Sequence, residues 1–263
     1  MRPNVPPLME TTQTAAAGQD EAPIPAEAIV VPERGFTINR KKALIVAAFC
    51  WIGFAIMVYA VTHGMTGNFD ERGLLSYRTG EALGPSGPKL IFESVRDVTA
   101  LGGVFLRNLF ALVAVVALLF LKLRREAFLY AATVINGWLA NTGVKLLVGR
   151  ERPQIVPHLT EAGGESFPSG HSFSAAVVYI GMAIAFAALS KNHTVRYTVI
   201  GFAMVLSAMV AWSRVMLGVH FPSDVTAGWL GGAGWAFLAA ALLYAPAKAA
   251  ADSEAGKKLD PAS

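Results

Sequence analysis

The chain has 263 residues, of which 54% are hydrophobic and 15% are charged, and its mean hydropathy is +0.48. A soluble domain of this size usually carries about 25% charged residues, so the composition argues against a soluble protein. A single cysteine, Cys50, excludes an internal disulfide framework and a cysteine-built metal site. The net charge of +4 would suggest a nucleic-acid partner in a soluble protein. Here the basic residues stand at the ends of apolar runs, which favours membrane orientation and no nucleic-acid binding.

The two ends of the chain differ in composition from its middle. Residues 1–42 hold six of the fourteen prolines, and their five basic residues balance five acidic ones. Such a stretch cannot bury an apolar core, so we expect a disordered tail there and a second one over 246–263. A basic start followed directly by an apolar stretch is missing, so we expect no signal peptide.

Six apolar stretches of about 18 to 23 residues lie between the tails. About 20 helical residues cross a hydrocarbon core about 30 Å thick, and lipid requires every backbone polar group to be satisfied within the segment. The sequence therefore predicts an all-α, polytopic membrane protein in which residues 43–245 form a bundle of six transmembrane helices. The stretches are 43–62, 99–121, 127–147, 172–190, 196–213 and 225–245.

The distribution of lysine and arginine predicts the orientation. If the amino terminus is cytoplasmic, thirteen basic residues fall on the inner side and eight on the outer side, while Arg107 falls inside the second stretch. This bias follows the positive-inside rule and places both tails in the cytoplasm. The long connection 63–98 is then outside, and its segment 68–78 is typical of a short amphipathic helix at the membrane surface. We also expect this connection to cover the site described next.

Three polar segments fall on the same outer face under this topology: KLLVGRERP at 145–153, PSGH at 168–171 and SRVMLGVHFPSD at 213–224. Ionisable groups beside a membrane core are costly and therefore indicate function. In the first segment, Lys145 and Arg152 are seven residues apart and share one face if the helix continues to Pro153, where it must end. Alone, they would be two cations at a membrane boundary.

The other two segments add an anion site and a paired histidine. Ser169 is expected to cap the following helix, and the backbone N–H near Gly170 would then bind an anion that His171 touches. In the third segment Pro222 suits the first turn of a helix, which places Asp224 just inside it. The Asp224 carboxylate can accept a hydrogen bond from one nitrogen of His220 and leave the other nitrogen free to attack. With Arg214, the three cations suit a tetrahedral oxyanion, and phosphate is the natural candidate.

These residues also resemble a known family. Lys145-x6-Arg152-Pro153, Pro168-Ser169-Gly170-His171 and Ser213-Arg214-x5-His220-x3-Asp224 match every position of the three-part signature of the type 2 phosphatidic acid phosphatases. The six apolar stretches favour the membrane lipid-phosphatase branch of this family over its soluble acid phosphatases and haloperoxidases.

The resemblance implies a role for each residue. His220 would be the nucleophile that forms a phosphohistidine, Asp224 would orient it, and His171 would be the general acid. Lys145, Arg152 and Arg214 would bind the non-bridging oxygens, helped by Ser169 and Gly170. No metal or other cofactor is implied. The partners would be the bilayer and a membrane lipid phosphate or diphosphate, such as phosphatidic acid, phosphatidylglycerol phosphate, undecaprenyl diphosphate or a sphingoid phosphate. A bacterial inner membrane with a periplasmic site is the expected location.

Two alternatives remain at this level. A phosphotransferase would use the same phosphoenzyme with a lipid or sugar hydroxyl in place of water. An anion transporter would be expected to show inverted repeats and helices interrupted near the midplane, whereas the polar residues here lie at predicted helix ends. The sequence leaves the identity of the lipid and the oligomeric state open.

Overall fold

The computed structural model describes residues 39–187, 189–190 and 192–244. The predicted tails, 1–42 and 246–263, lie outside the described residues except for residues 39–42, where the first helix already begins at Arg40. The Asn39 side chain accepts a hydrogen bond from the Lys42 N–H at 3.0 Å and so caps this helix. The helix therefore starts three residues before the apolar stretch predicted from the sequence.

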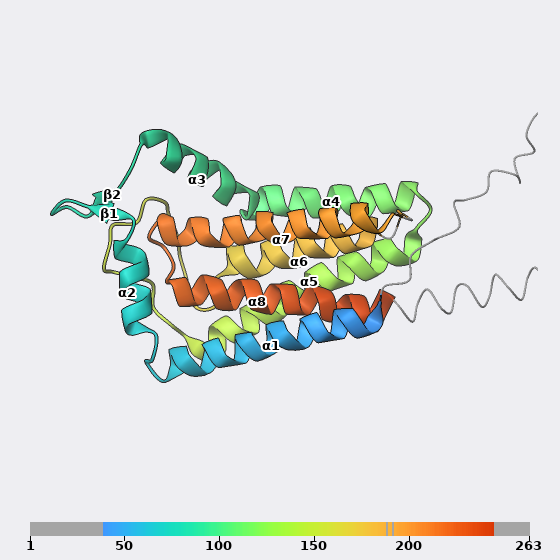
Figure 1. Ribbon diagram of the computed structural model, residues 1–263, viewed down its shortest axis with the longest axis horizontal. Helices are drawn as coiled ribbons and strands as arrows, with labels where there is room; N and C mark the ends of the chain where they lie inside the picture. The colour runs from blue at the N-terminus through green and yellow to red at the C-terminus, as the bar shows by residue number, and fades with distance from the viewer. Residues whose placement is uncertain (1–38, 188, 191, 245–263) are drawn as a thin grey trace, which may run out of the picture. The chain divides into compact units, whose positions relative to one another are not determined.

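Helices make up most of the described chain (Figure 1). One short antiparallel pair, β1 (Arg78–Thr79) and β2 (Gly84–Pro85), holds the only strands among the described residues. The helices are α1 (Arg40–Thr62), α2 (Gly67–Leu75), α3 (Lys89–Leu101), α4 (Val104–Phe120), α5 (Arg124–Val148), α6 (Gly170–Ala187), α7 (His193–Met216) and α8 (Pro222–Ala239), which the π-helical turn η2 (Ala240–Tyr244) continues.

Helix α6 lies at the centre of the bundle, where it contacts α5, α7 and α8, and α1 lies along α8 (Figure 1). Almost every side chain of α6 is buried. Glycines on α8 allow the closest approach: a Cβ atom added to Gly232 would lie 2.2 Å from the Phe173 carbonyl oxygen. On the opposite side of α6, the fully buried Tyr130 of α5 donates a hydrogen bond to the Val178 carbonyl at 3.1 Å.

The outward faces of the helices are apolar. Large hydrophobic side chains on α1, α4 and α5 are more than two-thirds exposed, a pattern that a soluble surface rarely shows over such an area. Examples are Phe49, Phe105, Phe120 and Phe128. Because lipid tails are the solvent that suits such side chains, the structure is that of a helical membrane protein.

The number of membrane spans differs from the six expected. Four helical segments of the described chain are long and apolar enough to cross a membrane, namely α1, α6, α7 and α8 with its continuation to Leu242, and the bent pair α3 and α4 makes a fifth if it acts as one span. Helix α5 is long enough, but Thr133, Asn136 and Asn141 lower its hydropathy. The expectation of one straight helix over 99–121 is wrong, because the chain breaks at Gly102 and bends by 50°. A count of six remains a prediction.

The connection 63–98 is more ordered than predicted. It contains the expected short helix, α2, but the α2 residues Asp70 and Leu74 are buried against the bundle, so this helix does not simply lie on the surface. It also contains most of α3, which the sequence reading missed. Arg107, whose position the sequence left open, is only 8% exposed and contacts the Gly102 carbonyl at 3.4 Å.

The close approach of α6 and α8 predicts that Gly232→Ala destabilises the protein by about 1–3 kcal/mol, because the added methyl group meets a backbone carbonyl that cannot move aside. Thermal unfolding in detergent measures this effect. Gly201→Ala on α7 is the matched control, since nothing lies within 4 Å of its added Cβ. Equal melting temperatures for the two variants would contradict the packing described here.

Candidate active site

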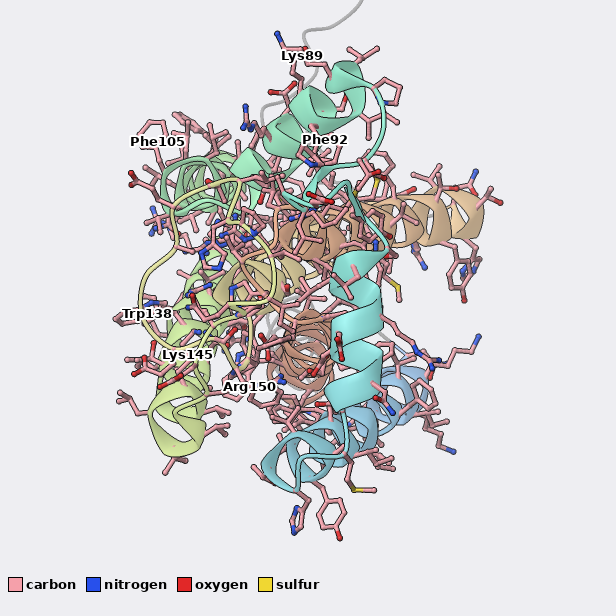
Figure 2. The ribbon with its side chains drawn as sticks, turned by 90° about the vertical axis from the view of Figure 1, so that its left-hand side faces the viewer. Lys89, Phe92, Phe105, Trp138, Lys145 and Arg150 are labelled. Atoms are coloured by element: carbon pink, nitrogen blue, oxygen red, sulfur yellow. The ribbon has the colours of Figure 1, made fainter. Side chains whose placement is uncertain are left out.

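The three polar segments meet at one end of the bundle, where α5 and α7 end and α6 and α8 begin. Figure 2 looks onto this end, where Lys145 and Arg150 are labelled. A cavity of about 340 Å³ opens there. It is lined by Lys145, Arg152, Glu161, Ala162, Gly163, Gly164, Glu165, Gly170, His171, Arg214 and His220. The structure thus brings six of the eight predicted site residues to one cavity, and Ser169 and Asp224 lie behind its wall.

The first segment reaches the cavity by a route that the sequence did not predict. Helix α5 ends at Val148, because Gly149 adopts a left-handed conformation (φ 60°) and its N–H caps the Lys145 carbonyl at 2.9 Å. The expectation that the helix continues to Pro153 is therefore wrong. Lys145 reaches the cavity from the last turn of α5, whereas Arg152 reaches it from the irregular connection 149–169.

The cations of the cavity are held by neutral oxygens. Lys145 Nζ donates to the Glu165 carbonyl at 2.6 Å, and Arg152 donates to the carbonyls of Gly163 and Gly164 at 2.8 and 3.0 Å. Arg214 Nη1 donates to Thr99 Oγ1 at 3.0 Å, and its buried Nε has no hydrogen-bond partner among the described residues. Within the described residues no carboxylate is hydrogen-bonded to these three cations, so their positive charge is available to an anion in the cavity.

The second segment begins α6 as predicted. Ser169 is fully buried, and its Oγ accepts from the Ser172 N–H at 3.5 Å, the contact expected of a helix cap. Gly170 and His171 form the first turn of α6 and line the cavity. The Ser169 N–H donates to the Asp224 carbonyl at 3.0 Å, which ties this segment to α8.

His220 lies in the turn between α7 and α8 and is only 1% exposed. Its Nε2 is 3.1 Å from Arg152 Nη1. A guanidinium group only donates, so Nε2 must accept, and the ring proton lies on Nδ1. Burial lowers the pKa of His220 to about 4; the nearby Asp224 opposes this shift, while Arg152 and Arg214 add to it. The ring is therefore neutral at neutral pH, with an Nε2 lone pair at the cavity.

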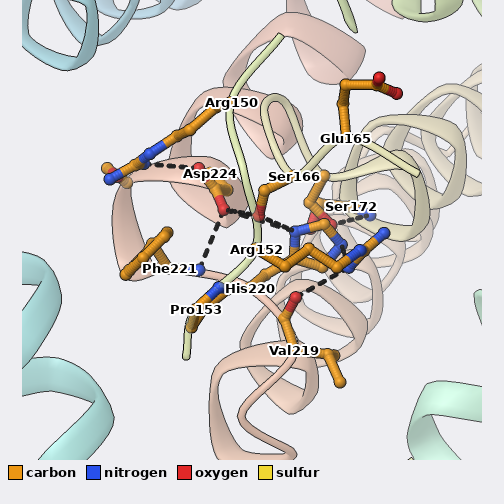
Figure 3. Close-up of polar contacts among 12 residues, drawn as sticks. Arg150, Arg152, Pro153, Glu165, Ser166, Ser172, Val219, His220, Phe221 and Asp224 are labelled. Atoms are coloured by element: carbon orange, nitrogen blue, oxygen red, sulfur yellow. Dashed lines mark hydrogen bonds and ion pairs between the residues drawn. The ribbon is translucent and has the colours of Figure 1, made fainter. Parts of the chain in front are cut away.

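The Nδ1 side of His220 faces Asp224, at 3.4 Å from its Oδ2. Ser166 completes the link, because its Oγ lies 3.2 Å from Nδ1 and donates to the same carboxylate oxygen (Figure 3). The predicted pairing of His220 with Asp224 is present, but Ser166 was missed. Its sequence signal was its place two residues before Pro168, next to a motif rather than within it.

Arg150 is the second residue that sequence reading missed, since it was counted only as an outer cation. Its Nη1 donates to Asp224 Oδ1 at 2.6 Å, opposite the side that faces His220 (Figure 3). Pro222 opens α8, as predicted, and Asp224 Oδ2 also accepts from the Phe221 N–H at 3.0 Å. The carboxylate is thus fully buried and bonded on both oxygens.

Among the described residues, none from the connection 63–98 lines the cavity, and the expectation that this connection covers the pocket stays a prediction. The described residues that line it beyond the helices come from the connection 149–169 and from the turn that holds His220. Among the described residues, no group of three or more His, Cys, Asp or Glu side chains is arranged to hold a metal ion.

Three curated relatives match parts of this chain. The lipid A 1-phosphatase of Rhizobium etli is 36% identical over 128 residues, which cover 45% of this chain and 50% of the relative. The lipid A 1-phosphatase of Rhizobium johnstonii is 34% identical over 128 residues, covering 45% and 48%. The phosphatidylglycerophosphatase B of Bacillus subtilis is 40% identical over 94 residues, covering 34% and 44%. The chain thus spans about half the length of the curated relatives it matches.

A solved structure and a family model extend the likeness. The crystal structure of a transmembrane PAP2 type phosphatidylglycerolphosphate phosphatase from Bacillus subtilis superposes with a TM-score of 0.66 and 26% identity, covering 73% of this chain and 93% of that one. The model of the PAP2 superfamily matches residues 126–247, which contain all three polar segments. Residues 126–247 therefore carry a PAP2 superfamily domain, as the three motifs predicted.

Proposed function

We propose that this protein is a membrane phosphatase that hydrolyses a lipid phosphate or diphosphate through a phosphohistidine on His220, without a metal ion. One observation carries the proposal: the Nε2 lone pair of a buried, neutral histidine faces a cavity that also holds Lys145, Arg152 and Arg214. Two kinds of relatives bear the names of lipid phosphatases, which supports a lipid substrate.

In the first step, Nε2 of His220 attacks the phosphorus atom and the bond to the leaving oxygen breaks. The leaving oxygen takes a proton from His171, which lines the same cavity. The guanidinium of Arg152 turns from Nε2 to a phosphate oxygen, and Lys145, Arg214 and the Gly170 N–H bind the others. The positive charge that develops on the ring is stabilised by Asp224 through Nδ1.

In the second step, water attacks the phosphohistidine and His171 accepts its proton. The P–N bond breaks, inorganic phosphate leaves, and His220 returns to its neutral form. Three fixed cations supply the positive charge that many phosphoryl-transfer enzymes obtain from metal ions. Ser169 acts indirectly, because its cap contact fixes the first turn of α6 and with it the Gly170 N–H.

The location of the reaction rests on charge. The excess of basic residues on one side of the apolar stretches favours cytoplasmic termini and a site at the periplasmic face of a bacterial inner membrane. A lipid in the outer leaflet could then present its phosphate to the cavity while its tails stay in the bilayer. Phosphotransfer to a hydroxyl acceptor is the second candidate, since the same phosphoenzyme serves both reactions.

The direct test is phosphate release by the detergent-purified protein in excess EDTA. The panel contains phosphatidic acid, phosphatidylglycerol phosphate, undecaprenyl diphosphate, sphingosine phosphate and lipid A. We expect release from at least one lipid and its loss, by a factor of about 10³ or more, in His220→Ala. Release that survives in this variant would overturn the assigned nucleophile, and transfer to an added alcohol at the expense of free phosphate would indicate a phosphotransferase.

The dependence of kcat/KM on pH should show an unusually acidic limb. His220 attacks only when neutral, so activity is present above its pKa and is lost as the pH falls through that value. Because burial lowers this pKa to about 4, the limb should lie near pH 4 rather than near the ordinary value of about 6.5. A decline at higher pH is expected in kcat rather than in kcat/KM, because His171 gains its proton beside the bound phosphate and loses it as the pH rises. After correction for the ionisation of the substrate, a limb near pH 6.5 or a flat profile would contradict the assignment.

The Ser166 hydroxyl should contribute to kcat through the His220 ring. Ser166→Ala removes the bridge between Nδ1 and Asp224, and one hydrogen bond of this kind corresponds to about a tenfold decrease in kcat. Ser172→Ala is the matched control, because its buried hydroxyl has no hydrogen-bond partner among the described residues. An unchanged kcat in Ser166→Ala, measured on the best lipid of the panel, would show that the bridge has no kinetic role.

A further inference from the structure

A carboxylate outside the three motifs is built into the wall of the site. Asp70 of α2 is only 2% exposed. Its Oδ1 accepts from the Ser223 N–H at 2.9 Å, and its Oδ2 accepts from Ser223 Oγ at 2.7 Å and from Arg150 Nη2 at 2.8 Å. Burial of a charged carboxylate is costly, and these three bonds are what makes it tolerable. They join α2 to the first turn of α8, which also carries Asp224.

Arg150 connects the two carboxylates. One guanidinium nitrogen binds Asp224 Oδ1 at 2.6 Å, and the other binds Asp70 Oδ2 at 2.8 Å. The guanidinium also lies over the Phe221 ring, 4.1 Å from its centroid, and donates to Ser223 Oγ at 2.7 Å. These four contacts fix the position and the orientation of the planar guanidinium group. Because Asp70 holds one of its nitrogens, the other nitrogen faces Asp224.

Asp70, Arg150 and Asp224 form a row of alternating charges, and these charges explain why a second carboxylate is useful. Asp224 must be negative to stabilise a positive His220 ring, but Arg150 bonded to Asp224 alone would largely cancel that negative charge. Asp70 on the far side of Arg150 offsets the cation. The row Asp70, Arg150 and Asp224 then carries a net charge of −1, which a phosphorylated or protonated ring brings to zero.

We propose that Asp70 is a positioning residue of the reaction: acting through Arg150, it keeps the Asp224 carboxylate oriented and negative toward the His220 ring. This inference rests on the function proposed above. The groups that face His220 come from every neighbouring element and define the background against which Asp70 acts. They are Asp224 of α8, Arg214 of α7, His171 of α6, Lys145 of α5, and Arg152, Glu165 and Ser166 of the connection 149–169.

The segment that carries Asp70 has other anchors, so removing one charge should not detach it. Leu74 is fully buried, the Trp212 indole N–H donates to the Tyr77 hydroxyl at 2.7 Å, and Arg78 Nη1 donates to the Met216 carbonyl at 3.0 Å. Asp70→Asn keeps the shape of the side chain and the acceptor for the Ser223 N–H. It is therefore the variant that removes the charge with least damage to the fold.

The matched control is Glu71→Gln, which removes the same charge from the next residue of α2, where the side chain is exposed. Two readouts are measured in both variants: kcat on the best lipid of the panel, and the titration of His220 followed by NMR of histidine-labelled protein in detergent. The His220 signal is assigned by its loss in His220→Ala. The titration requires no turnover, so it tests the positioning role separately from the proposed reaction.

We expect Asp70→Asn to lower kcat about tenfold, because the developing positive charge on the ring loses part of its stabilisation. The same loss disfavours the protonated ring, so the His220 midpoint should move to lower pH. Glu71→Gln should change neither quantity. Wild-type kcat and an unshifted titration in Asp70→Asn would overturn the inference while leaving the phosphatase assignment intact. A shifted titration in a protein that hydrolyses no lipid phosphate would sink the proposed function instead.

Discussion

The buried carboxylate of Asp224 is the interaction on which the site depends. Its side chain bonds Arg150 on one oxygen and Ser166 and the Phe221 N–H on the other, and its own carbonyl accepts from the Ser169 N–H. Arg150, the stretch 166–169 and the start of α8 thus converge on one fully buried residue. Such a charge is stable inside a protein only when every lone pair is satisfied. Loss of one of these hydrogen bonds is therefore expected to destabilise the whole group of contacts around Asp224.

The bundle provides the rigidity that this group of contacts requires. Helices α6 and α8 approach so closely at Gly232 that their backbones fix the relative height of Gly170 and Asp224. The cavity itself is completed by irregular chain, chiefly residues 161–165 and the turn that holds His220. A scaffold of packed helices thus positions functional groups carried on loops, an arrangement common in enzymes.

The connection 63–98 is part of the same construction. Helix α2 docks through Asp70 and Leu74 against the start of α8 and the end of α7, and Val95 of α3 packs on Leu217 and Val219 beside His220. The turn that carries His220 is therefore enclosed from two directions by a segment whose sequence reads only as an amphipathic surface connection. The ring of His220 is buried within this turn, and burial lowers its pKa.

Hydropathy and motif spacing are local properties of the chain, and they were enough to predict the helical membrane class, the approximate helix positions and the meeting of the three polar segments. The break at Gly102, the end of α5 at Gly149 and the contacts of Ser166, Arg150 and Asp70 became visible only in the folded protein. The residues 149–169 have no periodicity from which a direction could be inferred. Asp70 and Arg150 are 80 residues apart, and such a contact depends on packing that no local pattern encodes.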